Sequence, residues 1–349
     1  MAKYVVAGAT GRVGSVVARE LLNRNHAVTV IVRDETRGPE WAQRGADVAV
    51  GSLDDRAFVA AVVRDASGFF TLLPENVPPE HFHGTRRRMA DAIASGACDG
   101  GVPHIVMLSA LAAVLSDGNG PAKDLHYAER QLAARAQQLT LLRACYFQEN
   151  VASVIPAAQH AGIYPNFLAS ADTPIPMIAT RDIGRFAAQA LLAPAPGGEI
   201  VDLFGPAYSI RQVARALGAA LGKELRVIDL PPSRHSEALA EAGVPRPIAD
   251  AVAEMFAAFN AGLITPQGDR SLIGTTPIDE VITQVMRGGP TGVAMRQHRS
   301  AEWIEGRAGG HDVDLQSDVN AGSVRAVFGG APVPAIRRGR AESSQSDPG

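Results

Sequence analysis

Apolar residues open the chain as a short β-rich run and then change to helical spacing. Residues 4–6 are Tyr-Val-Val, glycines follow at Gly8, Gly11 and Gly14, and apolar residues then recur at helical intervals over residues 16–22. Runs of β-branched and aromatic residues are typical of strands, and apolar residues three and four apart are typical of a helix. The pattern predicts a strand, a glycine-rich turn and a helix in direct succession.

The same alternation continues to about residue 150. The predicted strands cover residues 26–33, 46–50, 68–73, 104–109 and 139–143, and the predicted helices cover residues 55–64, 81–97 and 124–137. Strands separated by helices return by right-handed crossovers and form a parallel sheet. The predicted fold class is therefore α/β, with a Rossmann-like, doubly wound parallel sheet of six strands over residues 1–150.

The pattern loosens after Asn150, where prolines at positions 156, 165, 174 and 176 are taken to mark loops. Later strands are expected at residues 199–204 and 225–229, and helices at residues 181–192, 210–221, 236–242 and 247–261. This is too irregular for a second Rossmann unit, so we expect residues 151–287 to form a small irregular C-terminal lobe, interleaved with the sheet, that covers the substrate. Residues 288–349 have no sustained period and are expected to be a disordered tail.

Charge and composition narrow the classes of molecule that the protein is expected to bind. The chain has 33 basic and 36 acidic residues, well mixed, and a formal charge of −3. This balance favours neither a nucleic-acid nor a membrane partner. A secretory leader and an 18-residue apolar run are both missing from the sequence, so the expected location is cytoplasmic. The two cysteines, Cys98 and Cys145, have no metal-ligand spacing, and no metal site is expected.

The three glycines have a chemical explanation. Gly8 lets the chain turn tightly, Gly11 lets the backbone approach a pyrophosphate, and Gly14 lets the helix pack close to the strand. Exposed amides and the positive helix end then bind the anion. We predict a dinucleotide site, rather than a plain glycine turn, with Thr10, Arg12 and Val13 as further members.

The end of the second strand selects the dinucleotide. An acidic residue there accepts hydrogen bonds from the NAD ribose, whereas an arginine meets the 2′-phosphate of NADP. The chain has Arg33 and then Asp34, and we favour NADPH, with NADH as the alternative; Arg33 as a surface residue paired with Asp34 is the other interpretation. Asp54 follows the third strand and either accepts from the adenine amino group or caps the next helix.

Several ordered motifs together resemble one family. They are GATGRVG in the glycine turn, VIVRD at the second strand end, GSLDD after the third strand, LSA around Ser109, and TLLRACYFQEN over residues 140–150. With later segments, the similarity spans residues 3–287. The chain resembles the NmrA-like branch of the atypical short-chain dehydrogenase/reductases.

The resemblance implies an activity. The family contains NADPH-dependent quinone and azo-dye reductases, aromatic reductases such as isoflavone reductase, and dinucleotide-sensing regulators with little or no catalysis. The expected function is an NADPH-dependent reductase that transfers hydride directly to a quinone-like or conjugated carbonyl molecule. The alternative is a non-catalytic NADP(H)-sensing redox regulator that acts through a protein partner.

The predicted helix over residues 124–137 carries the catalytic candidates. Ordinary short-chain dehydrogenases use Tyr-x-x-x-Lys, but Gln131 stands four residues after Tyr127, so that mechanism is not expected and Tyr127 is taken as a packing residue. In aromatic-reductase relatives a lysine near the helix start acts as base. His126 falls near that place and Lys123 one turn earlier, so both are candidates. A hydrogen bond from His126 to the cofactor ribose and a plain surface role are the alternatives, and Glu129 either orients His126 or pairs with it on the helix surface.

The remaining candidates lie where open α/β sheets place ligands, at the carboxyl ends of strands. Ser109 either hydrogen-bonds a carbonyl substrate or caps its strand. Phe147 is either a substrate contact or part of the core. The cofactor-binding candidates in the loop beside the nicotinamide are Leu72, Leu73 and Pro74, and the substrate-binding candidates opposite them are Phe147 and Asn150.

Overall fold

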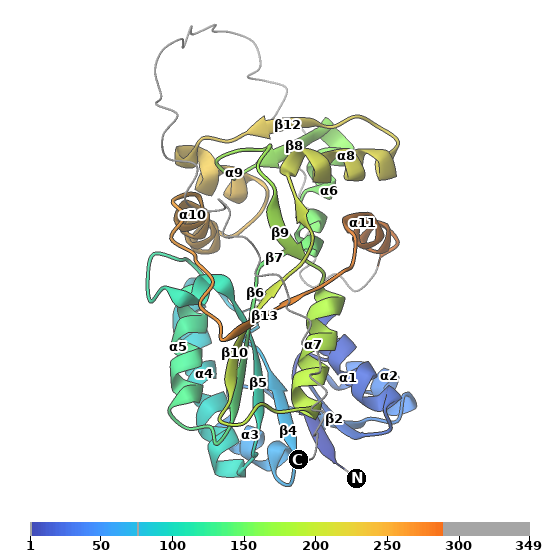
Figure 1. Cartoon of the computed structure of the whole chain (residues 1–349), viewed down its shortest axis with the longest axis vertical. Helices are drawn as coiled ribbons and strands as arrows, with labels where there is room; N and C mark the ends of the chain where they lie inside the picture. Colours follow the sequence, from blue (N-terminus) through green and yellow to red (C-terminus); the bar gives the residue numbers. More distant parts are fainter. Residues whose placement is uncertain (1, 75–76, 289–349) are drawn as a thin grey trace, which may run out of the picture. The chain divides into compact units, whose positions relative to one another are not determined.

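The structure is a computed structural model that describes residues 2–74 and 77–288. Apart from Gly288, the predicted tail over residues 288–349 lies outside the described residues. Within the described part, eight strands form one sheet in the order β13-β10-β6-β5-β4-β1-β2-β3, and every neighbouring pair is parallel (Figure 1). This confirms the predicted α/β class and the Rossmann-like parallel sheet.

The strands of this sheet are short. Their bounds are β1 (Lys3–Val6), β2 (Ala27–Val32), β3 (Asp47–Val50), β4 (Gly68–Thr71), β5 (Ile105–Ala110), β6 (Leu139–Ala144), β10 (Glu199–Phe204) and β13 (Arg270–Ile273). The first six match the strands predicted over residues 1–150. The strand predicted at residues 199–204 is β10, which joins this sheet beside β6, and β13 joins it beside β10.

Helices cover both faces of the sheet. Tyr4 and Val6 of β1 pack in one core with residues of α1, α2 and α7, whereas Val5 packs in a second core with residues of α3, α4 and α5. Figure 1 shows these two groups of helices on opposite sides of the strands. Because both faces are covered, the central strands β1, β2 and β4 are almost entirely buried and mostly apolar, whereas the edge strands β3 and β13 are more exposed and carry charged residues. The helix bounds are α1 (Arg12–Asn23), α2 (Gly38–Gln43), α3 (Arg56–Val63), α4 (Phe82–Gly100), α5 (Ala122–Ala133) and α7 (Thr180–Leu192).

A third core packs together most of the remaining elements after β6. It includes buried residues of β8, β9, α8 and α11, for example Tyr164, Met177, Leu217 and Ile282. The bounds of the remaining strands and α-helices are β7 (Tyr146–Phe147), α6 (Ile155–Ala161), β8 (Ile163–Asn166), β9 (Ile175–Ile178), β11 (Ala207–Tyr208), α8 (Ile210–Leu221), β12 (Arg226–Asp229), α9 (His235–Glu241), α10 (Arg246–Asn260) and α11 (Ile278–Met286), and all of them except α9 contribute residues to this core. A boundary at residue 150 between two domains stays a prediction. In the part of the chain that is described, no helix combines the length and the apolar character that a membrane span requires.

The proline assignments after residue 150 need correction. Pro165 lies inside β8 and Pro176 inside β9, and Pro156 stands in the first turn of α6. Proline is tolerated at the edges of sheets and at the start of a helix, because its missing N–H is not needed there. Within the described residues β8 pairs with β12 in a two-stranded sheet, so Pro165 stands in an edge strand and not a loop, whereas Pro176 stands in β9, between β11 and β7.

His104 is a buried titratable residue just before β5. It is 2% exposed, and its Nε2 lies 3.0 Å from the Thr140 hydroxyl on β6. Burial lowers the pKa of His104 from 6.5 to about 4. The folded protein therefore resists protonating this imidazole, while the unfolded chain protonates it near pH 6.5.

Acidification should therefore destabilise the fold through His104. As pH falls from 6.5 to 4, the unfolded state takes up a proton that the folded state does not, and we expect a loss of up to about 3 kcal/mol in the free energy of unfolding. Urea unfolding across this pH range should show a shallower loss for His104→Gln than for the wild type. The exposed His160 supplies the control, since His160→Gln should keep the wild-type slope; equal slopes for all three proteins would contradict the assignment.

Candidate functional site

The glycine-rich turn between β1 and α1 forms the first part of the site. Gly8 has a φ of +66°, and the Gly11 amide donates to the Gly8 carbonyl at 2.9 Å. A Cβ atom on Gly14 would lie 2.3 Å from the Gly8 oxygen. Only glycine therefore lets α1 begin so close to the turn. The three glycines make the tight turn that their spacing predicts.

The start of α1 leaves room for an anion. The first amides of an α-helix have no partner within the helix. Here the N-cap residue is Gly11, which has no side chain to accept from them, and the first turn has no acidic residue. Thr10 is exposed and Arg12 is half-buried, whereas the Val13 side chain is buried in the core and leaves only its backbone for a ligand. These residues fit a pyrophosphate group, which the amides would hold.

The end of β2 separates the roles of Arg33 and Asp34. Asp34 caps the short turn that follows, and its Oδ1 accepts from the Thr36 hydroxyl at 2.7 Å and the Thr36 amide at 2.9 Å. Hydrogen bonds from Thr36 hold the pKa of Asp34 below its usual range. The Arg33 side chain is exposed. One carboxylate oxygen therefore holds the local turn, and the exposed Arg33 is the group beside it that suits a ribose phosphate.

The structure at the end of β3 rules out one of the two interpretations of Asp54, that it caps the next helix. The residue that caps α3 is Asp55, whose Oδ1 accepts from the amides of Ala57 at 2.9 Å and Phe58 at 3.1 Å. Asp54 is exposed and does not cap this helix. The capping interpretation of Asp54 is wrong because the helix begins one residue later than expected. Its predicted contact with adenine stays a prediction.

A buried polar network occupies the carboxyl ends of β5 and β6. Ser109 on β5 donates its hydroxyl to Glu129 on α5 at 2.6 Å, and Arg143 on β6 binds both oxygens of Glu129, at 3.0 and 2.6 Å. All three side chains are less than a tenth exposed. Both interpretations of Glu129 are wrong, because it is buried and Arg143 and Ser109 take both of its oxygens, so it neither orients His126 nor pairs with it on the helix surface. Ser109 joins a strand to a helix and does not cap its strand.

His126 is held in one tautomer. Its Nδ1 lies 2.8 Å from the Ala113 carbonyl oxygen. A carbonyl oxygen can only accept, so Nδ1 carries the hydrogen and Nε2 is the nitrogen that can exchange a proton. The ring is half-buried. Among the residues that the structure describes, Nε2 has no hydrogen-bond partner.

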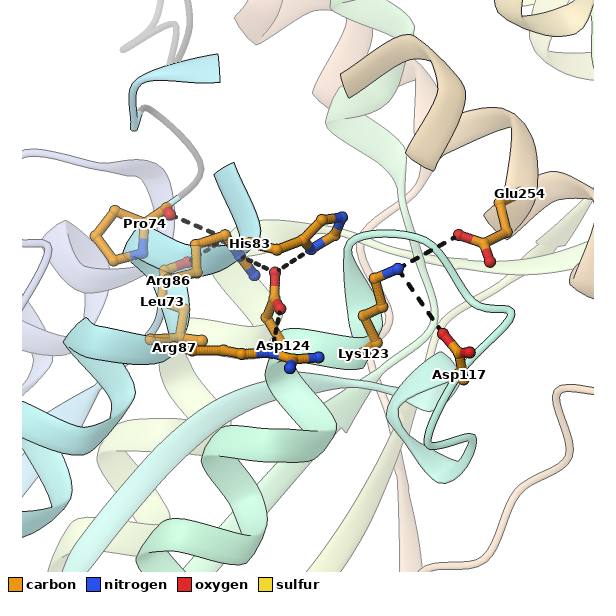
Figure 2. Close-up of polar contacts among 9 residues, drawn as sticks. All are labelled: Leu73, Pro74, His83, Arg86, Arg87, Asp117, Lys123, Asp124 and Glu254. Atoms are coloured by element: carbon orange, nitrogen blue, oxygen red, sulfur yellow. Dashed lines mark hydrogen bonds and ion pairs between the residues drawn. The ribbon is translucent and has the colours of Figure 1, made fainter. Parts of the chain in front are cut away.

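Lys123 and Tyr127 are both engaged with neighbouring helices or loops. The Lys123 ammonium lies 3.8 Å from Asp117 and 4.0 Å from Glu254 on α10 (Figure 2). The Tyr127 hydroxyl donates to Asp91 on α4 at 2.8 Å, and this bond together with burial raises the pKa of Tyr127. Tyr127 therefore packs between α5 and α4, as the missing Tyr-x-x-x-Lys pattern indicates, although its hydroxyl is bonded and not free in solvent.

The loop after β4 is held by a residue that the sequence did not single out. Arg86 on α4 donates from Nη1 to the carbonyls of Leu73 and Pro74, at 3.3 and 2.9 Å, and from Nε to Asp124 on α5 at 3.2 Å. Figure 2 shows Arg86 between this loop and Asp124. The run of three arginines at residues 86–88 gave no signal that its first member is buried.

The segment after β6 lies opposite the glycine turn. Phe147 is partly buried against the core that α1 and α7 share with the sheet, which favours the core interpretation, and Asn150 is exposed. Arg12 reaches this segment, with its Nη1 3.5 Å from the Glu149 carbonyl oxygen. The buried Glu149 carboxylate accepts from the amide and hydroxyl of Thr180 at the start of α7. Burial raises the pKa of Glu149, against the opposing effect of these hydrogen bonds.

Two curated proteins and one family model match the chain. The model of the NmrA-like family matches residues 2–288. NAD(P)H azoreductase of Xenophilus azovorans is 26% identical over 254 residues, which cover 72% of this chain and 86% of that protein. Quinone oxidoreductase 2 of Escherichia coli (strain K12) is 26% identical over 252 residues, which cover 71% of this chain and 85% of that protein.

Solved structures share the fold. Triphenylmethane reductase from Citrobacter sp. superposes with a TM-score of 0.68 at 19% identity, over 82% of this chain and 100% of that one. The NADPH complex of quinone oxidoreductase QOR2 from Escherichia coli gives a TM-score of 0.66 at 23% identity, over 81% of this chain and 99% of that one. The match extends well beyond the glycine turn.

Burial should decide how much each arginine–carboxylate pair contributes. Arg143→Met leaves the Glu129 charge buried without its main partner, and we expect a loss of about 3–5 kcal/mol in the free energy of unfolding. Arg56 binds Asp99 with the same two-point geometry at 2.6 and 3.0 Å, but both side chains are exposed. Urea unfolding of Arg56→Met should therefore resemble the wild type. Equal losses in the two variants would show that burial of Glu129 is not the cause.

Proposed function

The chain belongs to the NmrA-like family, and from this membership and its site we propose that it is an NADPH-dependent reductase of quinone-like or conjugated carbonyl compounds. The observation that carries the cofactor assignment is the end of β2, where Asp34 is committed to Thr36 and Arg33 is exposed beside it. An arginine suits the 2′-phosphate that distinguishes NADPH from NADH. The azoreductase and quinone oxidoreductase relatives support reduction of a small conjugated molecule.

In this proposal the glycine turn and the strand ends bind different parts of the cofactor and the substrate. The amides at the start of α1 hold the pyrophosphate, and Arg33 holds the ribose phosphate. Bound NADPH supplies a hydride, so the protein has to orient the two reactants and exclude water. Reduction of a quinone to a hydroquinone also consumes one proton. The loop of residues 72–74 and the segment of Phe147 and Asn150 lie at the strand ends where open α/β sheets bind ligands.

His126 is the residue best suited to supply that proton. Its Nδ1 is fixed by Ala113, which leaves Nε2 as the nitrogen that can give or take a proton. The other two candidates are less suited, because the Ser109 hydroxyl donates to Glu129 and the Lys123 ammonium is paired with Asp117 and Glu254. We assign Ser109 and Lys123 to holding α5 in place.

Cofactor titration of the purified protein, followed by the loss of NADPH absorbance on adding a panel of small quinones, tests the proposal. Binding of NADPH with turnover of a quinone is the expected result. Tight binding without turnover on quinones, enones or azo compounds would contradict the reductase and favour the NADP(H)-sensing regulator. Failure to bind NADPH would contradict both functions.

Arg33 should determine the preference between the two nicotinamide dinucleotides. Arg33→Ala removes a charged donor to the 2′-phosphate, so we expect NADPH affinity to fall about tenfold or more with little change for NADH. The dissociation constants for both cofactors measure this. Arg24 at the far end of α1 is a matched exposed arginine, and Arg24→Ala should change neither constant. A similar loss of NADPH and NADH affinity in Arg33→Ala would refute the assignment.

His126 should shape the pH dependence of turnover. If Nε2 donates the proton, kcat should fall as pH rises because the proton donor is lost, and His126→Gln should flatten this dependence. The control is His160→Gln, on the exposed surface of α6. An unchanged pH profile of kcat in His126→Gln would show that His126 does not donate the proton and has a structural role instead.

A further inference from the structure

Arg86 is a buried arginine with an unusual set of acceptors. It is 2% exposed, and its guanidinium lies 5.1 Å from the centre of the Phe82 ring on the same helix. One nitrogen, Nη1, donates to the carbonyl oxygens of two successive residues, Leu73 and Pro74. Both carbonyls lie just beyond the carboxyl end of β4. Arg86 thus connects α4 to the strand edge at which ligands bind.

Asp124 compensates the charge of Arg86 and has further partners. Its side chain is fully buried, and its Oδ2 accepts from Arg86 Nε at 3.2 Å and contacts His83 Nδ1 at 2.7 Å. Its Oδ1 accepts from Arg87 Nε at 3.3 Å. Figure 2 shows the three basic side chains around this one carboxylate. Loss of Arg86 alone would therefore leave Asp124 with two partners.

The held loop touches the glycine turn. A Cβ atom on Gly8 would lie 2.8 Å from Cδ2 of Leu72, so the Leu72 side chain packs directly on the first glycine. Leu72 is thus placed by the turn, and the next two residues are placed by Arg86. The backbone of residues 72–74 has little freedom between these two supports.

We propose that Arg86 and Asp124 are positioning residues that hold residues 72–74 against the glycine turn and thereby shape the nicotinamide half of the cofactor site. This inference rests on the proposed NADPH function. Stability alone does not explain the pair, because apolar residues of similar volume often replace a buried ion pair without loss. An apolar side chain cannot, however, donate to two successive carbonyls, and a guanidinium can.

The test compares Arg86→Met with Arg87→Met. Both variants remove a guanidinium from Asp124, but only Arg86 contacts the loop. Two ligands are titrated: NADPH, and adenosine 2′,5′-bisphosphate, which has the adenine half and no nicotinamide. We expect Arg86→Met to weaken NADPH binding about tenfold and to leave the bisphosphate within about twofold of wild type. Arg87→Met should change neither, and Arg86→Lys, which keeps a donor, should recover part of the NADPH affinity.

The possible results distinguish failure of this inference from failure of the proposed function. A wild-type protein that binds neither ligand overturns the proposed function and the inference with it. A wild-type protein that binds both, with Arg86→Met matching Arg87→Met or losing both ligands equally, overturns the inference alone. If Arg86→Met does not fold, Arg86→Lys decides: a loss confined to NADPH supports the positioning role, and unchanged binding of both ligands overturns it.

Discussion

Parallel pairing throughout the large sheet is the constraint on which the rest of the structure depends. After each strand the chain must cross back over a face of the sheet, so all strands end at the same edge. Residues far apart in sequence therefore meet there: the glycine turn at Gly8, Arg33 after β2, the loop at Leu73, and Ser109 and Arg143 on adjacent strands. The site is a product of this topology.

Three buried carboxylates reinforce the same edge. Glu129 binds Arg143, Asp124 binds Arg86, and Glu149 binds Thr180 at the start of α7. Removing a carboxylate from water costs several kcal/mol unless its oxygens are hydrogen-bonded. Each bond joins a different pair of elements: Glu129 joins α5 to β6, Asp124 joins α5 to α4, and Glu149 joins the segment after β6 to α7.

Local signals explain why the first half of the fold was predictable from sequence. β-branched runs, helical spacing and the glycine turn each specify an element without reference to the rest of the chain. The later strands were harder, because proline is depleted in strands, and Pro165 on the edge strand β8 and Pro176 on the middle strand β9 therefore argued against strands at these places. The hydrogen-bond partners of the buried site residues were the hardest feature to predict. Glu129 and His126 have helix-surface spacing, which is worth a few tenths of a kcal/mol, whereas a buried Glu129 must pair with Arg143.

The approach of α10 to the start of α5 has a consequence for protein engineering. Gly120 has a φ of +59°, and a Cβ atom there would lie 1.9 Å from the Ala251 carbonyl oxygen on α10. Three residues later, Lys123 is paired with Glu254 on that helix. A chimera that takes α10 from another member of the family will therefore keep this close approach only if position 120 remains glycine. The two helices form an exchangeable module only as a pair.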